Sequence, residues 1–394
     1  MKQIPANPCK VIKIIATFAK NRNEMKVERE IAGFSLPFAA GTAFAAYSEV
    51  SSYSLSQAFA APSMLLSIAL AILLLFISGK DRRPTLTSVI MASTGLMLGL
   101  FCGLTANIME IHSGMGIISM KAEGIGRMMQ SACDSIPFCS KGTNAIVKAL
   151  LTGDRSDISD GITESFRKSG ASHILALSGL HLGIIYMLAV RCLSIMGNGR
   201  NASIARSVAT VMACGIYTLA TGAGPSITRA LLFIFLNETA KLSGRHSSTS
   251  SVLMSSLLIQ LCITPQAISS VGFQLSYAAM AGIAFIYPWM RNFWPGKERD
   301  GFFRNPVRWI WDSAALSISC QLATGPLVYL YFGSIPKHFI MTNLAALPLT
   351  GLLIPSAVAT VILNHTGICP DILIRITEKL ADLLTGCLET IACM

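Results

Sequence analysis

Apolar segments long enough to cross a lipid bilayer recur along this chain, and short polar linkers separate them. Their length indicates transmembrane helices, because a helix needs about 20 apolar residues to span the hydrocarbon core. The pattern therefore predicts an all-α fold, a polytopic transmembrane helical bundle of about ten spans with broken or re-entrant helices. The expected spans are residues 31–47, 62–78, 86–108, 173–195, 202–219, 226–242, 251–263, 273–289, 310–332 and 339–363.

Two further segments repeat apolar residues at three- and four-residue spacing, which is typical of amphipathic helices. The first covers about five turns and either lies on the outer membrane surface or packs against the bundle. The second, near the C-terminus, is predicted to lie on the membrane surface. The apolar positions are Ile118, Ala122, Ile125, Met129, Ala132 and Ile136 in the first helix and Ile372, Ile376, Leu380, Leu383 and Leu384 in the second.

Composition and charge agree with a membrane protein. Of the 394 residues, 52% are hydrophobic and 13% are charged, and the formal net charge is +11. Lys and Arg concentrate in alternate linkers, which predicts a cytoplasmic N-terminus without a signal peptide and a cytoplasmic C-terminus. The expected parts are a cytoplasmic N-terminal segment (1–30), a three-span unit (31–108), an extracytoplasmic segment with amphipathic helices (109–172), a seven-span core (173–363) and an amphipathic tail (364–394).

Polar groups concentrate where the extracytoplasmic segment enters the core, in ALLTGDRSDISDGITESFRKSGASHILALSGLHLG, residues 149–183. Gly153 permits an unusual backbone angle, so Asp154 and Arg155 after it predict a loop pinned by an ion pair or by side-chain to backbone hydrogen bonds. Arg167 lies in the last turn of a short predicted helix, where a cation complements the helix dipole.

Ser178 and His181 lie three residues apart on the span that His173 opens, so they share a helical face. Gly179 between them leaves room for close backbone approach. In one interpretation Ser178 bonds a carbonyl of its own helix and His181 bonds a neighbouring helix. In a second, both side chains line a water-filled pathway. A third is nucleophilic catalysis by Ser178, for which no acid lies nearby in the sequence.

The segment TGAGPSITRALL, residues 221–232, breaks an apolar region with two glycines and a proline. Ser226 can cap a new helix with Arg229 one turn inside it, and a helix start beside a guanidinium is a natural anion site. The alternative is that Arg229 snorkels to the nearby interface. Four more polar residues in later spans together indicate a polar interior. They are Gln274, Ser276, Gln321 and Asn343.

Signals for metal and redox chemistry are weak. The sequence has no HExxH motif, no zinc-type cysteine pair and no Walker-type phosphate loop, so we expect no metal, no cofactor and no ATPase activity. Cys133 and Cys139 fall in the segment expected outside, where an oxidising compartment permits a disulfide. Their spacing leaves open whether they are bonded.

Several blocks in order make the chain similar to the ComEC family, the competence channel proteins of bacterial inner membranes. The signature at 149–183 is followed by TGAGPSITRALL, TPQAISSVGFQLSYAAMAG, SCQLATGPLVYLYFG and TNLAALPLTGLLIP. The resemblance implies an inner-membrane channel core that translocates single-stranded DNA during natural transformation. Arg155, Arg167 and Arg229 are the best candidates for contact with phosphates. The candidates for the DNA path that fall within these blocks are Asp154, Arg155, Arg167, His173, Ser178, Gly179, His181, Arg229, Gln274, Ser276, Gln321 and Asn343.

Many members of that family carry an OB-like domain before the core and a metallo-β-lactamase-like domain after it, to which degradation of the discarded strand is attributed. We expect only the competence core here, acting as a channel and not as an enzyme. The resemblance implies single-stranded DNA and the lipid bilayer as partners. It also implies an outer-side DNA receptor, a cytoplasmic helicase-like motor and a separate nuclease. A homo-oligomer of this chain is compatible with the sequence. Two alternatives remain, an intramembrane serine hydrolase using Ser178 and a carrier or channel for small anionic solutes that uses Arg229.

Overall fold

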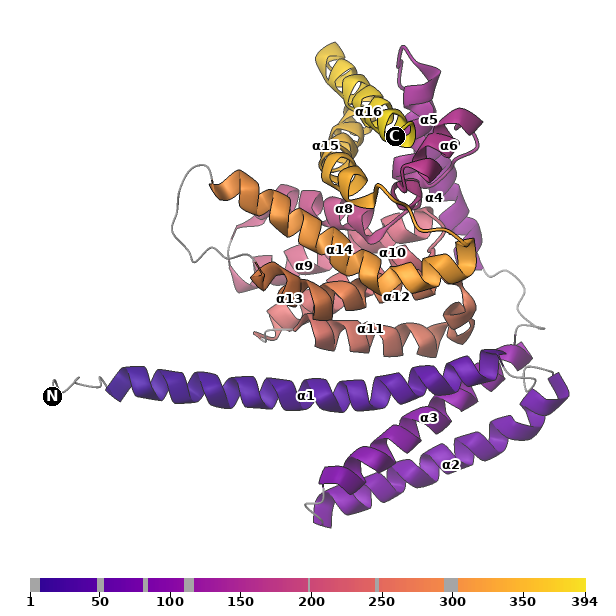
Figure 1. The fold of residues 1–394 in the computed structure, drawn as a ribbon, viewed down its shortest axis with the longest axis vertical. Helices are drawn as coiled ribbons and strands as arrows, with labels where there is room; N and C mark the ends of the chain where they lie inside the picture. Colours follow the sequence, from indigo (N-terminus) through magenta and orange to yellow (C-terminus); the bar gives the residue numbers. More distant parts are fainter. Residues whose placement is uncertain are drawn as a thin grey trace. The chain divides into compact units, whose positions relative to one another are not determined.

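The computed structural model describes residues 8–47, 53–80, 84–109, 117–197, 199–244, 248–293 and 304–394 (Figure 1). Within these ranges every regular element is a helix and none is a strand, which confirms the all-α prediction. Five of the described helices are long and apolar enough to cross a membrane, and three shorter helices are apolar as well. The chain is therefore a polytopic helical membrane protein.

The helices form two compact units, and each is described by itself. Residues 8–30 of the expected cytoplasmic segment and the first expected span belong to one continuous helix, α1. The elements of the first unit are α1 (Pro8–Tyr47), α2 (Tyr53–Lys80), α3 (Pro84–Met109), α11 (Thr249–Ile263) and the 3-10 helix η4 (Pro265–Ser269).

Glycines bring α1 and α3 into backbone contact within the first unit. A side chain on Gly41 of α1 would overlap the carbonyl oxygen of Leu96. A side chain on Gly99 of α3 would overlap the carbonyl oxygen of Phe38. Small residues allow this approach, which replaces side-chain packing by closer van der Waals contact between the two helices.

The second unit contains the candidate site and comprises Ser113–His246 and Val271–Met394. Its elements are α4 (Ile117–Asp134), α5 (Lys141–Thr152), α6 (Asp160–Lys168), α7 (Ser172–Leu175), α8 (Gly179–Leu193), η3 (Ser194–Met196), α9 (Arg200–Ala220), α10 (Pro225–Leu242), α12 (Val271–Ala281), the π-helical turn η5 (Gly282–Ile286), α13 (Tyr287–Asn292), α14 (Arg304–Phe332), α15 (Phe339–His365) and α16 (Asp371–Ala392).

The predicted amphipathic helix between the third and fourth spans is confirmed as α4, and it packs against α5 and α9. A Cβ on Gly126 would lie 2.6 Å from the carbonyl oxygen of Ala220, so α4 meets the end of α9 closely. At its C-terminal end Cys133 is buried in an apolar cluster with Val147 and Ile354. Of the two placements that the sequence left open, packing against the bundle is the one observed.

The C-terminal helix predicted from the sequence is present as α16, and the face that packs against the second unit only partly matches the expected apolar face. α16 packs along α15, and Figure 1 shows the two helices side by side. Leu384 and Leu388 are fully buried, whereas Ile372 and Leu383, both expected on the apolar face, are 68% and 58% exposed. Apolar residues occur on more than one side of this helix, so its own pattern does not decide which side meets α15.

Candidate functional site

The signature loop begins where α5 ends at Gly153. This glycine has a φ of 81°, in the left-handed region that glycine adopts most easily, and its N–H donates to the Ala149 carbonyl over 2.9 Å. A Cβ here would lie 2.5 Å from Leu177 Cδ1. The loop therefore runs close against the segment that precedes α8, and a larger residue would push the two apart.

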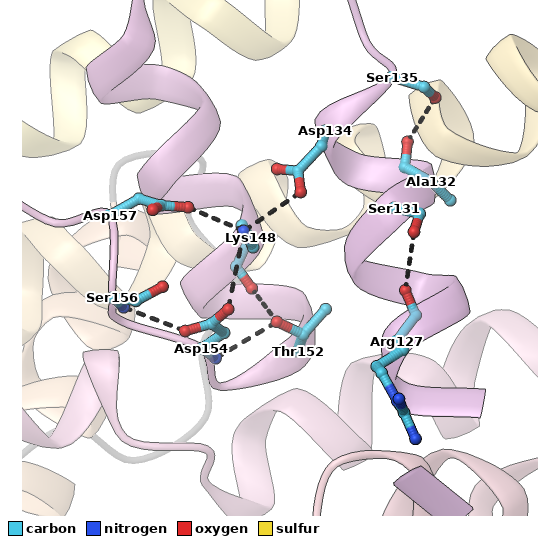
Figure 2. Close-up of polar contacts among 10 residues, drawn as sticks. All are labelled: Arg127, Ser131, Ala132, Asp134, Ser135, Lys148, Thr152, Asp154, Ser156 and Asp157. Atoms are coloured by element: carbon cyan, nitrogen blue, oxygen red, sulfur yellow. Dashed lines mark hydrogen bonds and ion pairs between the residues drawn. The ribbon is translucent and has the colours of Figure 1, made fainter. Parts of the chain in front are cut away.

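Lys148 on α5 lies at the centre of three carboxylates, which Figure 2 shows converging on its ammonium group. Its Nζ lies 2.8 Å from Asp157 and 3.2 Å from Asp134. Asp154 lies 3.6 Å away, and the lysine side chain is only 10% exposed. The hydrogen bond to Asp157, followed by the bond and charge of Asp134, raises the pKa of Lys148 despite its burial. We call these four residues the Lys148 cluster.

The Lys148 cluster joins α4, α5 and the signature loop, and sequence reasoning missed it. The sequence feature that pointed to the cluster is a single lysine inside the apolar stretch AIVKALL. A lysine with this little exposure is rare without partners, so its position could have prompted a search for carboxylates. Which carboxylates they are depends on how α4 and the loop fold against α5.

Asp154 and Arg155 pin the signature loop, as the sequence predicted. The Asp154 carboxylate accepts the Ser156 N–H over 3.0 Å, and this bond, with the nearby Lys148, lowers the pKa of Asp154. Arg155 Nε donates to the Leu175 carbonyl over 3.2 Å, which attaches the loop to α7. Both side chains are therefore engaged with the protein itself.

Arg167 and His173 lie at exposed positions. Arg167 forms a two-pronged pair with Glu164, with both N···O distances 2.8 Å, and its side chain is 72% exposed. His173 is exposed as well, and its Nδ1 lies 3.1 Å from the Gly170 carbonyl oxygen. Neither residue is part of a buried polar group.

The predicted span at 173–195 is interrupted, and treating it as one continuous helix was wrong. α7 ends at Leu175, the backbone is extended at Ala176 and Ser178, and α8 begins at Gly179. Ser178 caps α8, because its Oγ accepts the Leu180 N–H over 3.3 Å. A serine that can satisfy the first N–H groups makes a new helix start favourable at this position.

His181 completes a capping box with Ser178. The His181 Nδ1 accepts the Ser178 N–H over 3.2 Å and lies 2.9 Å from its Oγ. The interpretation in which Ser178 bonds a carbonyl of its own helix is therefore wrong. Because Nδ1 accepts, the proton of the neutral ring lies on Nε2, which is buried without a partner among the described residues.

The predicted break before Arg229 is confirmed, but Ser226 as the cap of the new helix was wrong, because Gly224 is the cap residue of α10 and no described side chain makes a capping hydrogen bond there. Gly222 and Ala223 both have positive φ, at 84° and 48°, and α10 begins with Pro225 in its first turn. The Ala223 carbonyl accepts a hydrogen bond from Thr228 Oγ1 over 2.9 Å, which closes the turn onto α10. Proline suits this first turn because it has no N–H to leave unbonded.

Arg229 is turned into the second unit, with 7% of its surface exposed, so the snorkelling alternative is wrong. Its Nη2 lies 3.6 Å from the position that a Cβ on Gly179 would take. Its Cζ lies 5.7 Å from the centre of the Tyr277 ring, a cation–π distance. Nη1 is buried without a hydrogen-bond partner among the described residues. The guanidinium thus meets the start of α8.

We call the group formed by Ser178, Gly179, His181, Arg229 and Tyr277 the Arg229 site. It brings together α8, α10 and α12, whose sequences are far apart. Beside it, Ser276 Oγ donates to Ser226 Oγ over 3.1 Å and joins α12 to the start of α10.

The other predicted polar residues form separate pairs. Tyr331 donates to Gln274 Oε1 over 2.7 Å, which joins α14 to α12. Asn343 Nδ2 donates to Ser317 Oγ over 3.3 Å, which joins α15 to α14. Gln321 Nε2 and Asn343 Oδ1 are buried and have no hydrogen-bond partner in the part of the chain that the structure describes.

Glu238 on α10 is a buried polar residue that the sequence analysis passed over. It is 6% exposed, and its carboxylate accepts hydrogen bonds from Ser207 and Lys241, each over 2.6 Å, and from the Tyr186 hydroxyl. These donors come from α8, α9 and α10, so the carboxylate ties the three helices together. The sequence feature that pointed to this residue is one acidic side chain in the apolar stretch LLFIFLNETAKL.

Cys133 and Cys139 are both free thiols in the structure. Cys133 is buried, whereas Cys139 is exposed and its N–H donates to Glu378 on α16. Among the described residues, no group of three His, Cys, Asp or Glu side chains could hold a metal ion.

The sequence profile of the family described as Competence protein matches residues 150–394, more than half of the chain. The chain belongs to this family. The match confirms the resemblance to the ComEC competence proteins, and it includes every residue of the Arg229 site.

Three curated relatives are similar to this chain. ComE operon protein 3 of Bacillus subtilis (strain 168) is 25% identical over 222 residues, 56% of this chain and 26% of that protein. Competence protein ComA of Neisseria gonorrhoeae is 26% identical over 256 residues, 63% of this chain and 36% of that protein. Uncharacterized protein YcaI of Escherichia coli (strain K12) is 28% identical over 229 residues, 57% of this chain and 30% of that protein. The matches thus span only about a third of these relatives' lengths or less, and no solved structure matches the chain.

Proposed function

We propose that this protein is a bacterial inner-membrane channel core that carries a single strand of DNA across the cytoplasmic membrane during DNA uptake. The observation that supports this most is Arg229, a buried cation with an unpartnered donor in the part of the chain that matches the competence family. Each nucleotide of the strand carries a negative phosphate. A path for it therefore needs cations that the protein's own carboxylates do not already neutralise.

Two breaks in the helical backbone support a polar path at this place. The segments 176–178 and 221–224 leave helical geometry, and the helices that follow them, α8 and α10, both contribute to the Arg229 site. Irregular backbone at membrane depth is tolerated only where protein surrounds it or where it lines a cavity. The unpartnered Gln321 Nε2 and Asn343 Oδ1 would add hydrogen bonds for a solvated strand.

The remaining parts of the proposal concern topology and partners. Both termini would be cytoplasmic, because Lys and Arg concentrate in alternate linkers. The protein would act as a channel without enzymatic activity of its own. An outer-side DNA receptor would deliver the strand, a cytoplasmic helicase-like motor would pull it and a separate nuclease would remove the other strand. Several copies of the chain could assemble.

The test is uptake of labelled DNA into cells, scored as internal DNA protected from added nuclease. The strains carry wild type, a deletion, Arg229→Gln or the control Arg191→Gln, which removes an exposed charge from the other end of α8. The deletion should abolish internal DNA, and Arg229→Gln should reduce it by about ten-fold or more, as expected for loss of a charge-assisted contact. The control should resemble wild type. Normal uptake in the deletion strain would show that this protein is not the conduit.

A channel for small anionic solutes is a second candidate, because a buried guanidinium beside a helix start suits any anion. Flux of labelled inorganic phosphate into vesicles that contain the purified protein distinguishes it. Flux that depends on Arg229, together with normal DNA uptake in the deletion strain, would replace the DNA proposal.

An intramembrane serine hydrolase is a third candidate, favoured only by the 2.9 Å distance between Ser178 Oγ and His181 Nδ1. The capping box accounts for that contact, and no carboxylate of the described residues orients the His181 ring. Covalent labelling by a serine-reactive probe that disappears in Ser178→Ala would establish the hydrolase.

A further inference from the structure

We infer that the start of α8 and the guanidinium of Arg229 form a buried site for one phosphodiester group. The assignment of that group to a DNA strand rests on the function proposed above. The site itself is argued from geometry and charge, and it can be tested without DNA uptake.

The first turn of α8 presents N–H groups at this place. The Leu180 N–H is bonded to Ser178 Oγ, and the N–H groups of His181 and Leu182 point to the Ser178 carbonyl over 3.1 and 3.5 Å. The Gly179 N–H has no acceptor among the described residues. α8 is 15 residues long, so its peptide dipoles give this end a partial positive charge.

Arg229 adds a full positive charge to the same place. Its Nη2 lies 3.6 Å from the Cβ position of Gly179, and its Nη1 is unpartnered in a side chain that is 7% exposed. A cation beside the positive end of a helix is repelled, and burial removes the water that would otherwise solvate it. The Tyr277 ring offsets only part of this penalty. An anion between the helix start and the guanidinium would remove both sources of instability.

The charge and the donors favour a phosphodiester among anions. One guanidinium and one helix end together present about one and a half positive charges, so the single negative charge of a phosphodiester is fully neutralised, whereas a dianion would leave about half a negative charge buried without compensation. A phosphodiester has two free oxygens, which can accept the Gly179 N–H and a guanidinium N–H together. The Nε2–H of His181 is a further buried donor within one turn of the same helix start.

A binding experiment on the purified full chain in a neutral, phosphate-free detergent tests the site. The probes are a short thymidine oligonucleotide and the same oligonucleotide with an uncharged methylphosphonate backbone, both read by fluorescence anisotropy. Arg229→Gln should weaken binding of the charged oligonucleotide by about ten-fold, equal to about 1.4 kcal/mol. The slope of log affinity against log salt should fall by about 0.7, the value for one lost contact to single-stranded nucleic acid. Arg191→Gln should change neither quantity.

Two further variants keep the result interpretable if Arg229→Gln folds poorly. Arg229→Lys keeps the charge but loses the planar fork, so its affinity should lie between those of wild type and Arg229→Gln. Gly179→Ala places a methyl group 3.4 Å from Ala230 Cβ and 3.6 Å from Arg229 Nη2, which are ordinary contacts, so the fold should persist. The methyl group should nevertheless crowd the place proposed for the phosphodiester oxygens, between the start of α8 and Arg229, and so weaken binding.

The outcomes separate the site from the proposed function. Equal binding of charged and uncharged oligonucleotides, or an unchanged affinity in all Arg229 and Gly179 variants, would overturn the site. Arg229-dependent binding of phosphatidylglycerol that an excess of oligonucleotide does not displace would identify a lipid headgroup and overturn the DNA assignment. Arg229-dependent binding with normal DNA uptake in the deletion strain would support the site and overturn the function.

Discussion

Lys148 and Arg229 are both cations on apolar helices of the second unit, and both are more than nine-tenths buried, with 8% and 7% of their surface exposed. The Lys148 ammonium has three carboxylates between 2.8 and 3.6 Å away. The Arg229 guanidinium has an aromatic ring and a helix start, and no described carboxylate forms an ion pair with it. The protein neutralises the first cation itself, which makes that cation structural. It leaves the second charge free for a ligand.

Removing Lys148 should give the largest effect on stability. In Lys148→Met three carboxylates face one another without a cation, and the free energy of unfolding should fall by about 2 kcal/mol, less than for a fully buried pair because Asp134 and Asp157 are about half exposed to solvent. Chemical unfolding in detergent, followed by circular dichroism, measures this change. Lys141→Met, which removes an exposed lysine from the same helix, is the control. Equal stability of the two variants would show that the cluster contributes little.

Removing Arg229 should increase the stability of the protein when no anion is present, whereas removing Lys148 decreases it. In Arg229→Met a buried, unpaired charge is replaced by an apolar side chain, and the free energy of unfolding should rise by about 1 kcal/mol. The same unfolding assay applies, with Arg191→Met as the control. A loss of stability would mean that the guanidinium has a structural partner, and the contrast with Lys148 would then fail.

Ser178→Ala tests the helix start that Arg229 meets. The substitution removes the cap of α8 and should lower the free energy of unfolding by about 1 kcal/mol. It should also weaken oligonucleotide binding, because the first turn of α8 would fray. Ser194→Ala, at the other end of α8, should leave binding unchanged. If Ser178→Ala is as stable as wild type and binds the oligonucleotide equally well, the cap of α8 is not needed for the Arg229 site.

The pH dependence of stability should report the Asp154 carboxylate, which accepts the Ser156 N–H and lies in the Lys148 cluster. The folded protein lowers the pKa of Asp154 below its ordinary value of 3.8, chiefly through the Ser156 N–H. Its contribution is therefore present above pH 3.8 and is lost as the pH falls through the lower, folded-state value. Asp154→Asn should remove this acid-dependent part of the stability, and unfolding curves recorded from neutral to acid pH measure the change. If wild type and Asp154→Asn lose stability equally as the pH falls, the folded protein does not stabilise the charged form of Asp154.

Arg167→Gln should have the smallest effect. The side chain is 72% exposed and pairs with Glu164 on its own helix, so neither stability nor DNA uptake should change measurably. A strong loss of uptake would show that exposed arginines of the signature also contact the strand. Burial would then not distinguish the arginines that contact the strand from those that do not.

The sequence predicted most of the helices, because helix formation and membrane insertion depend on local apolar length and periodicity. The break before α10 was also predictable, since glycine and proline act on their own backbone. The break before α8 was missed, because LALSGLHLG is apolar enough to continue a helix. Only the capping box of Ser178 and His181 shows that a new helix starts there.

By itself, therefore, the sequence determined the class of the protein, its family and the residues that had to be considered. It named three arginines as candidates for phosphate contact without separating them. Tertiary structure decided that Arg155 bonds a carbonyl of α7, that Arg167 pairs on the surface and that Arg229 is buried against the start of α8. The physical reason is that the charge state of a site depends on which groups surround it. Those groups come from helices that the chain order keeps far apart.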